Sequence, residues 1–351
     1  LTADIAELQM VYKPGTDEAV INGICLAAVE NNLVDSSLSK GLKEKLNPNN
    51  LNEISNLTGV DVDSFTEMAL ALVNGRKITF IAGEIVAKSL ARDKIGAALC
   101  NLNKLFGIEN KGQIAALARY ANSKGAEKLG LAAEPAPAIK QHLQKLWNYH
   151  SESPSHNTDA MFALMKKEEI KGFVAVGVNP IRLYPDREFA TGGLEKVDFM
   201  VACDLFETET TGLADVVLPL CSWAEYDGDY VNLEGRVQNS KRAIKPIEES
   251  KPAFEIADAI AEAFGKKLFQ SNEERNMEIN RLLKLNSIQP WPNEYLEVKA
   301  ELPEIEQGFP YPLFTGDDTH HSGHLTERSQ SLLNFCSEPY LELSEGLAQK
   351  L

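Results

Sequence analysis

The sequence predicts an α/β fold in which helices are layered on a doubly wound, mostly parallel sheet, of the Rossmann-like αβα type. Two short apolar runs, at residues 199–202 and 214–218, have the composition of strands that are buried on both faces of such a sheet. Helical patterns alternate with strand patterns along most of the chain, as a layered α/β domain requires. Pro219 ends the second run. Because ligands bind beyond the carboxyl ends of such strands, the polar residues that follow them are the first candidates for a site.

Two helices are predicted near the start of the chain. Residues 17–31 place apolar side chains at a spacing that forms one helical face. Asp61 or Asp63 provides the cap for a helix over residues 64–73. Both patterns indicate helices that bury one side.

A buried strand and further helices follow. Residues 77–83 have the pattern of a buried strand ending in glycine, and a helix is predicted over residues 93–105. Two loop-like segments rich in proline, alanine or serine, residues 131–138 and 151–157, flank a short helix over residues 138–149. The composition therefore shifts near the middle of the chain.

The second half repeats the alternation. A helix over residues 158–168, capped by Thr158, leads into a strand over residues 172–177. Helices are predicted over residues 253–264, ended by a glycine, and over residues 272–285, where the charge indicates an exposed helix. The segment 230–238 is expected to form a loop that carries ligand-binding groups.

Composition excludes several classes of protein. The chain has 351 residues, of which 44% are hydrophobic, enough to bury two ordinary cores. A net charge of −16 disfavours a nucleic-acid or anionic-membrane surface. No apolar run reaches the roughly 18 residues of a membrane span, and the first residues are not a signal peptide. We therefore expect no nucleic-acid partner and no direct membrane insertion.

The cysteines and histidines do not form a metal motif. The five cysteines contain no CxxC pair, and their odd number argues against a disulfide framework, so a reducing, cytoplasmic compartment fits best. Cys203 and Cys221 fall at predicted strand ends, where we interpret them as small buried side chains. His320, His321 and His324 lack a cysteine or carboxylate at ligand spacing, so no metal site is predicted.

The most informative motifs lie between Asp198 and Gln238. They are Thr-Glu-Thr at residues 208–210, Ala-Asp-Val-Val-Leu-Pro at 214–219 and Glu-Gly-Arg-Val-Gln at 234–238. Together they resemble the large subunit of molybdopterin oxidoreductases, the family that holds formate dehydrogenases and the large peripheral-arm subunit of NADH:quinone oxidoreductase (complex I). Two residues depart from the family pattern, with Cys203 in place of the usual Gln and Asp229 in place of the usual Thr.

Four further short stretches extend the resemblance over nearly the whole chain. They are Lys-Pro-Gly-Thr-Asp at residues 13–17, Asn-Ser-Lys-Gly-Ala at 122–126, Gly-Val-Asn-Pro at 177–180 and the segment 311–328. The resemblance implies that residues 1–120 form the later part of a first α/β domain and 121–300 a second α/β domain. Residues 301–351 would begin a β-barrel domain that contacts a dinucleotide. We expect the chain to be an internal segment of a larger subunit.

The resemblance also implies a set of residues that contact a pterin dinucleotide. Asp204 would accept paired hydrogen bonds from a guanine ring. Structural alternatives stay open: Asp17 as a helix cap, Asn179 as a turn residue, and Glu225 paired with Arg236. The implied set is Asp17, Arg119, Asn122, Asn179, Asp204, Thr208, Glu225, Arg236, His324, Thr326 and Arg328.

Three functions follow from the resemblance. The first is the body of the complex I large subunit, supporting electron transport from NADH through iron-sulfur clusters to quinone. The second is the catalytic body of a molybdenum or tungsten formate dehydrogenase, and the third is a purely structural interaction module. Cys203 and the sequence Ala118-Arg119-Tyr120-Ala121, where cofactor-binding members have an Arg-Gly-Gln-type turn, favour the first.

The favoured function carries several expectations. The partners would be other subunits of a respiratory or dehydrogenase complex, at the inner face of the cytoplasmic membrane. Molybdopterin guanine dinucleotide, molybdenum, tungsten and iron-sulfur clusters are the family's cofactors, but we expect none bound in this segment. We also expect the isolated segment to be inactive with formate or NADH, and Gly177 to lie beside Asp204 in the sheet.

Overall fold

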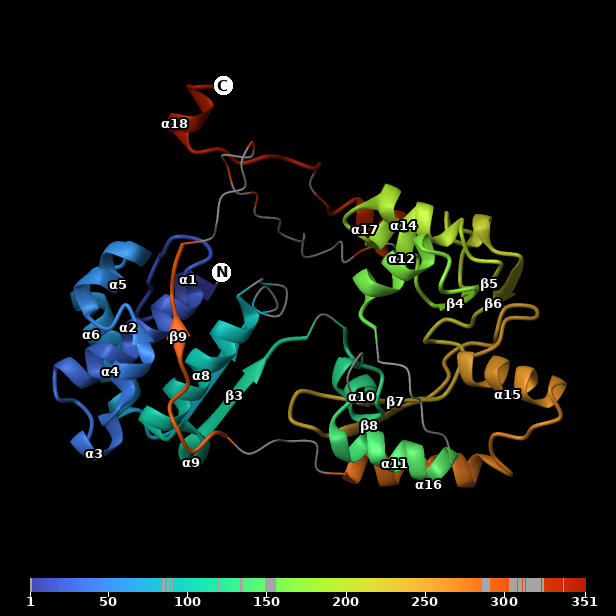
Figure 1. The fold of residues 1–351 in the computed structure, drawn as a ribbon, viewed down its shortest axis with the longest axis horizontal. Helices are drawn as coiled ribbons and strands as arrows, with labels where there is room; N and C mark the ends of the chain where they lie inside the picture. Colours follow the sequence, from blue (N-terminus) through green and yellow to red (C-terminus); the bar gives the residue numbers. More distant parts are fainter. Residues whose placement is uncertain are drawn as a thin grey trace. The chain divides into compact units, whose positions relative to one another are not determined.

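The computed structural model describes residues 2–83, 86, 89, 91–118, 120–132, 135–148, 156–285, 291–302, 308, 311, 313, 323, 325–336 and 338–351. The chain divides into two compact units, Leu1–Glu301 and Leu302–Leu351. Figure 1 shows the order of the elements along the chain.

The core of the N-terminal part forms around helix α2 (Asp17–Glu30), in which every residue from Glu18 to Ala28 is buried. It packs against α5 (Leu51–Thr58), α6 (Val62–Asn74) and α8 (Arg92–Phe106). Asp61 caps α6 by accepting a hydrogen bond from the N–H of Ser64. The predicted helices at 17–31, 64–73 and 93–105 are thus confirmed, but α2 is buried all round and not on the one face that its spacing predicts.

Two parallel strand pairs complete this part. Strand β2 (Ile78–Ala82), which the sequence predicts, pairs with β3 (Gly112–Ala116), which it does not. Glycine is required at residue 112, because a Cβ there would lie 1.6 Å from the carbonyl oxygen of Ile78. Strand β1 (Leu46–Asn47) pairs with β9 (Val298–Lys299), so the chain returns to this core shortly before residue 301.

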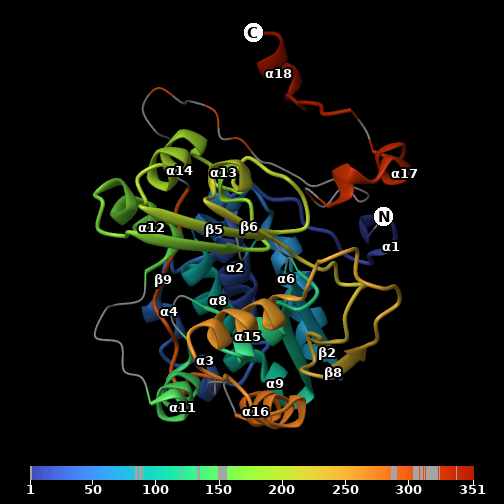
Figure 2. The ribbon, with the colours of Figure 1, turned by 90° about the vertical axis from the view of Figure 1, so that its right-hand side faces the viewer.

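The second α/β part contains a three-stranded parallel sheet in the order β4-β5-β6. Figure 2 shows β5 beside β6 in this sheet. Its strands are β4 (Gly172–Val176), β5 (Phe199–Asp204) and β6 (Val216–Pro219). Helices α12 (Thr158–Lys166), α13 (Pro180–Leu183) and α14 (Arg187–Leu194) cover one face. The strands are confirmed, and the strand order is what a parallel sheet with successive crossovers predicts.

Two details of this part differ from the prediction. Asn157, not Thr158, caps α12, because the Asn157 side chain accepts from the N–H of Ala160 at 2.9 Å. Phe199 at the start of β5 is exposed, and so are Val216 and Val217 of β6, so the predicted burial of both faces is wrong for β6 and for the start of β5. At the far end of the sheet, Cys203 packs with Leu220 and with Ile256.

Residues 228–240 form an antiparallel hairpin, not the predicted loop, with strands β7 (Gly228–Val231) and β8 (Val237–Ser240). Four further helices belong to this half of the chain: α10 (Ser123–Lys128), α11 (Pro137–Trp147), α15 (Ala253–Ala263) and α16 (Asn272–Lys284). The predicted helices at 138–149, 253–264 and 272–285 are confirmed.

The remaining elements are short. In the first unit they are α1 (Thr2–Ile5), α3 (Ser36–Ser39), α4 (Leu42–Lys45), α9 (Ile108–Lys111) and η1 (Thr211–Leu213). The second unit contributes η2 (Thr326–Arg328), α17 (Gln330–Leu333) and α18 (Glu345–Ala348). Its described residues contain no strand, so the expected start of a β-barrel is not shown.

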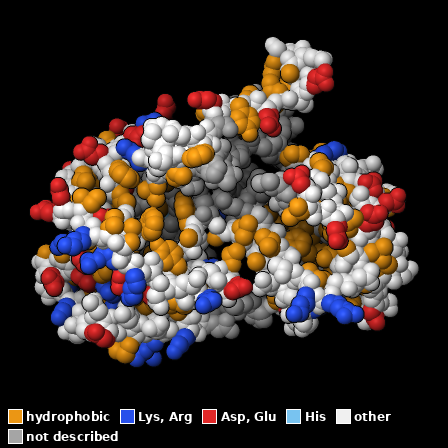
Figure 3. All heavy atoms as spheres, turned by 180° about the vertical axis from the view of Figure 1, so that it is seen from behind, with side chains coloured by type: hydrophobic (Ala, Val, Ile, Leu, Met, Phe, Trp, Pro, Cys, Tyr) orange, Lys and Arg blue, Asp and Glu red, His pale blue; other side chains and the backbone are white. Residues whose placement is uncertain are grey.

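Acidic, basic and hydrophobic side chains are interspersed on the face drawn in Figure 3. Within the described ranges, every helix is too short or too polar to cross a membrane.

Candidate functional site

The carboxyl ends of β4, β5 and β6 lie side by side at one edge of their sheet. The N–H of Gly177 donates to the carbonyl oxygen of Cys203 at 2.8 Å, and the N–H of Leu220 donates to that of Asp204 at 3.0 Å. The register pairs Val176 with Cys203. The predicted adjacency of Gly177 and Asp204 is therefore confirmed, and the turns that follow the strands meet at this edge.

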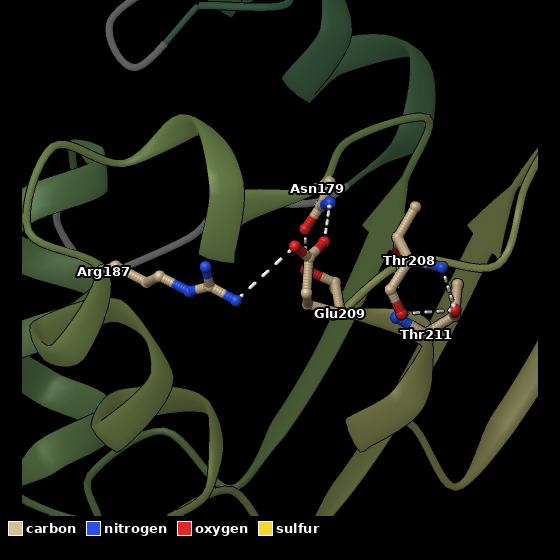
Figure 4. A network of polar contacts seen from close by, with 6 residues as sticks. Asn179, Arg187, Thr208, Glu209 and Thr211 are labelled. Atoms are coloured by element: carbon tan, nitrogen blue, oxygen red, sulfur yellow. Dashed lines mark hydrogen bonds and ion pairs between the residues drawn. The ribbon is translucent and has the colours of Figure 1, made fainter. Parts of the chain in front are cut away.

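Asn179 joins the turn after β4 to the loop after β5 (Figure 4). Its side chain is 2% exposed. Its Nδ2 donates to Glu209 Oε2 at 2.7 Å, and its Oδ1 accepts from the hydroxyl of Thr210 at 2.7 Å. Both amide groups are thus engaged within the protein, and the side chain does not cap α13. Asn179 therefore holds the turn after β4 and the loop after β5 together.

Glu209 is the charged centre of this network, and the sequence motifs did not single it out as a site residue. The hydrogen bond from Asn179 lowers the pKa of its carboxyl group, and the nearby positive charges of Arg187 and Arg182 act in the same direction. Arg187 Nη2 lies 3.5 Å from Glu209 Oε1, as Figure 4 shows. The network therefore holds an ionised carboxylate beside the carboxyl ends of two strands.

Thr208 and Thr211 close the loop after β5 into a tight turn (Figure 4). The N–H of Thr208 donates to the Thr211 hydroxyl at 2.7 Å, and the N–H of Thr211 donates to the Thr208 hydroxyl at 3.2 Å. The Thr211 hydroxyl in turn donates to the Thr208 carbonyl at 2.9 Å. This turn leads into η1 and fixes the loop before β6.

Asp204 is the last residue of β5 and is 8% exposed. Its Oδ1 accepts a hydrogen bond from the N–H of Leu205 at 2.7 Å, the one bond that its carboxylate makes with the described residues. The second oxygen keeps its capacity to accept from a ligand.

Glu225 is 4% exposed and binds backbone groups from two directions. Its carboxylate accepts from the N–H of Ser222 at 2.6 Å and from that of Ile247 at 2.9 Å, and the bond from Ser222 is the main cause of its lowered pKa. The alternative in which Glu225 pairs with Arg236 is not seen: these two described residues form no ion pair, and Glu225 binds backbone N–H groups instead. Arg236 is exposed, and its N–H donates to Asn232 Oδ1 at 2.9 Å.

Four other predicted residues belong to other elements. Asp17 is the first residue of α2, not its cap, and accepts from the Tyr12 hydroxyl at 2.9 Å. Asn122 bonds to the backbone of β7. In the second unit, Thr326 donates to the carbonyl of Gly323 at 2.8 Å and, with Arg328, forms part of η2.

Two predicted residues, Arg119 and His324, lie outside the described residues. The histidine pair at 320 and 321 does so as well. Among the residues that the structure does describe, no group of three or more His, Cys, Asp or Glu side chains could hold a metal ion.

A polar cavity of about 610 Å³ lies between the hairpin and helices α15 and α16. Arg275 stacks on the ring of Phe254, with the guanidinium carbon 4.1 Å from the ring centroid. Both carboxylates and cations line the cavity, among them Asp258 and Arg242. Glu225 is the one predicted site residue in its lining, so the cavity is distinct from the edge of the β4-β5-β6 sheet.

The sequence is similar to the large subunits of several redox enzymes. It is 27% identical to the F420-dependent formate dehydrogenase subunit alpha of Methanocaldococcus jannaschii, with 100% of this chain and 60% of that protein aligned. It is 28% identical to the assimilatory nitrate reductase catalytic subunit of Bacillus subtilis, over 76% of this chain and 40% of that protein. It is 26% identical to an NADH-quinone oxidoreductase subunit of Rhizobium meliloti, over 80% and 36%.

The fold is similar to that of a solved structure. Acetylene hydratase from Pelobacter acetylenicus superposes with a TM-score of 0.58 at 20% sequence identity, covering 87% of this chain and 47% of that one. This likeness shows the fold alone. The chain spans between 36% and 60% of the length of the three relatives named above.

The family comparison identifies the family of the chain and corrects the expectation about its cofactor. A family model described as molybdopterin oxidoreductase matches residues 1–263, which include the β4-β5-β6 edge. The expectation that no cofactor belongs to this segment is therefore wrong: the family binds a molybdopterin cofactor, and the matched region covers most of the chain. Departures at single positions such as Cys203 were too little to outweigh a pattern of that length. The chain belongs to the molybdopterin oxidoreductase family.

Proposed function

We propose that the carboxyl edge of the β4-β5-β6 sheet contacts the dinucleotide end of a molybdopterin cofactor in the large subunit of an oxidoreductase. Asp204 carries this proposal. It is a buried carboxylate at the end of a parallel strand with an acceptor to spare, which is the group that the N–H donors of a guanine require.

The neighbouring residues fit such a ligand. Thr208 lies in a turn fixed by three hydrogen bonds, so its position is set before a ligand arrives. Asn179 and Glu225, whose polar atoms are engaged internally, would hold the turns in place instead of contacting the ligand. When bound, the cofactor supplies a metal centre for two-electron chemistry.

The other predicted contacts remain part of the proposal. Asp17 and Arg119 would contribute from residues 1–120, and the exposed Arg236 from the hairpin loop. His324, Thr326 and Arg328 would contribute from a C-terminal domain. Residues 121–300, apart from the segment around β9 that returns to the first core, would form the second α/β domain that holds the edge.

The first candidate is a formate dehydrogenase-like large subunit. Formate dehydrogenase alpha subunits of Methanocaldococcus jannaschii and Methanococcus maripaludis align with 100% of this chain, at 27% and 25% identity. The complex I large subunit is the second candidate, favoured by Cys203 and supported by the Rhizobium meliloti relative, which aligns with 80%. Because these relatives are named as subunits, we propose that the protein works with partner subunits, and in the second case at the membrane surface.

The test uses the full-length protein that contains this chain. Asp204→Asn exchanges an acceptor oxygen for a donor, and we expect it to lower the content of molybdenum or tungsten, and of releasable pterin, at least several-fold. Asp198→Asn is the matched control, because Asp198 lies just before the opposite end of the same strand and is exposed. A wild-type protein without pterin or metal would contradict the proposal. Formate-dependent dye reduction then separates the two candidates.

A further inference from the structure

Asn122 forms an unusual pair of hydrogen bonds with strand β7. Its Nδ2 donates to the carbonyl oxygen of Asp229 at 2.9 Å, and its Oδ1 accepts from the N–H of Val231 at 2.9 Å. These are the donor and acceptor that a neighbouring strand would supply to β7. The Asn122 side chain thus bonds to β7 as a residue of a neighbouring strand would, although Asn122 and Asp229 are 107 positions apart in the sequence.

The local sequence does not explain this arrangement. Asn122 occupies the cap position of α10, where asparagine usually accepts from an N–H of the first helical turn, yet it makes no such bond. The backbone is shaped to admit its side chain, because a Cβ on Gly125 would lie 2.2 Å from Asn122 Oδ1. Glycine at residue 125 therefore leaves the space that the Asn122 side chain needs to reach β7.

The contact fixes more than one strand. β7 pairs with β8 from Gly228 opposite Ser240 to Val231 opposite Val237. The loop between them is closed by Asn232, whose Oδ1 accepts from the N–H of Arg236 at 2.9 Å, and by Gly235 with a φ of +82°. Holding β7 in place therefore also holds the backbone that carries Arg236.

We propose that Asn122 is a positioning residue: it fastens the β7–β8 hairpin to the turn before α10 and thereby sets the place of Arg236. The fastening itself stands on the hydrogen bonds alone. The effect of this contact on a bound ligand rests on the proposed function, in which the Arg236 loop faces the cofactor.

Hydrogen–deuterium exchange on the full-length protein tests the fastening without any activity. Asn122→Ala removes both bonds, and we expect exchange at Val231 to rise about tenfold, with smaller increases through the hairpin. Asn122→Asp keeps the acceptor for Val231 but sets a carboxylate oxygen against the Asp229 carbonyl oxygen, so it should restore only part of the protection at Val231. Gly125→Ala displaces the Asn122 side chain and should resemble Asn122→Ala. Asn52→Ala, an asparagine on the exposed side of α5, is the control.

The outcomes separate the fastening from the ligand. Wild-type exchange at Val231 in both Asn122→Ala and Gly125→Ala would overturn the fastening. If Asn122→Ala is globally unfolded, the Asp and Gly125 variants decide. Faster exchange in the hairpin together with an unchanged pterin content would contradict a role of this contact in cofactor binding. Failure of the proposed function shows differently, as a wild-type protein without pterin or an Asp204→Asn protein that keeps it.

Discussion

Asn179 and Glu209 are joined by a 2.7 Å hydrogen bond that ties the turn after β4 to the loop after β5. Asn179 is 2% exposed and its amide oxygen also accepts from Thr210, so no water molecule can replace its partners without opening the edge of the sheet. Because the two residues are 30 positions apart, the bond holds together segments that the chain alone would leave independent.

Replacing Asn179 should weaken this edge. Asn179→Ala removes both bonds and leaves the Thr210 hydroxyl buried without its acceptor, so we expect the free energy of unfolding to fall by about 1–3 kcal/mol. Urea denaturation measures the change. Thr208→Ala, which leaves the Asn179 contacts intact, should cost less, and an equal loss in both variants would contradict the assigned role.

Gly112→Ala should disrupt the pairing of β2 with β3. The new Cβ would lie 1.6 Å from the carbonyl oxygen of Ile78, and backbone atoms cannot move aside as a flexible side chain can. We expect a loss of about 3 kcal/mol or more in thermal or urea unfolding. Gly83→Ala follows β2 at a position where a Cβ meets nothing within 4 Å, so it should change stability little. Equal stability of the two variants would show that β3 does not pair as described.

Glu18 should make the protein less stable as the pH rises. The residue is 1% exposed, its Oε2 has no hydrogen-bond partner in the described part of the chain, and burial raises the pKa of its carboxyl group. Since the folded pKa lies above the unfolded one, the neutral form's contribution is present at low pH and is lost as the pH rises through the folded pKa. Glu18→Gln should remove this component, so denaturation midpoints of the two proteins should diverge with increasing pH. Parallel curves from pH 4 to 8 would refute the expectation.

Glu301 should have the opposite pH dependence. Hydrogen bonds from Lys94 and Lys299 lower the pKa of its carboxyl group to about 2. The stabilising contribution is therefore present above the unfolded pKa and is lost as the pH falls toward about 2. The difference in stability between wild type and Glu301→Gln should shrink over that range, and added salt should reduce it at neutral pH because the groups are exposed. A difference that persists at pH 2 would argue against the ion pairs.

Local patterns in the sequence determined much of the fold. Apolar spacing and caps predicted α2, α6 and α8 to within two residues, because a helix satisfies its own backbone and signals its ends nearby. Compact apolar runs predicted β5 and β6, and the order of the strands along the chain predicted that β4 and β5 are neighbours. The motifs around residues 198–238 also indicated the family.

Only the tertiary structure decided which residues complete the edge of the sheet. Glu209 and Arg187 look like ordinary surface charges in the sequence, and their place depends on how the loop after β5 folds over Asn179. β3 was missed because its strand character comes from pairing with β2, not from its own composition. The resemblance implied Asn122 only as a ligand contact, yet its side chain bonds to β7, with Asp229 107 residues away. A hydrogen bond between distant segments leaves no periodic mark in sequence, because its energy depends on where the packed core places both ends.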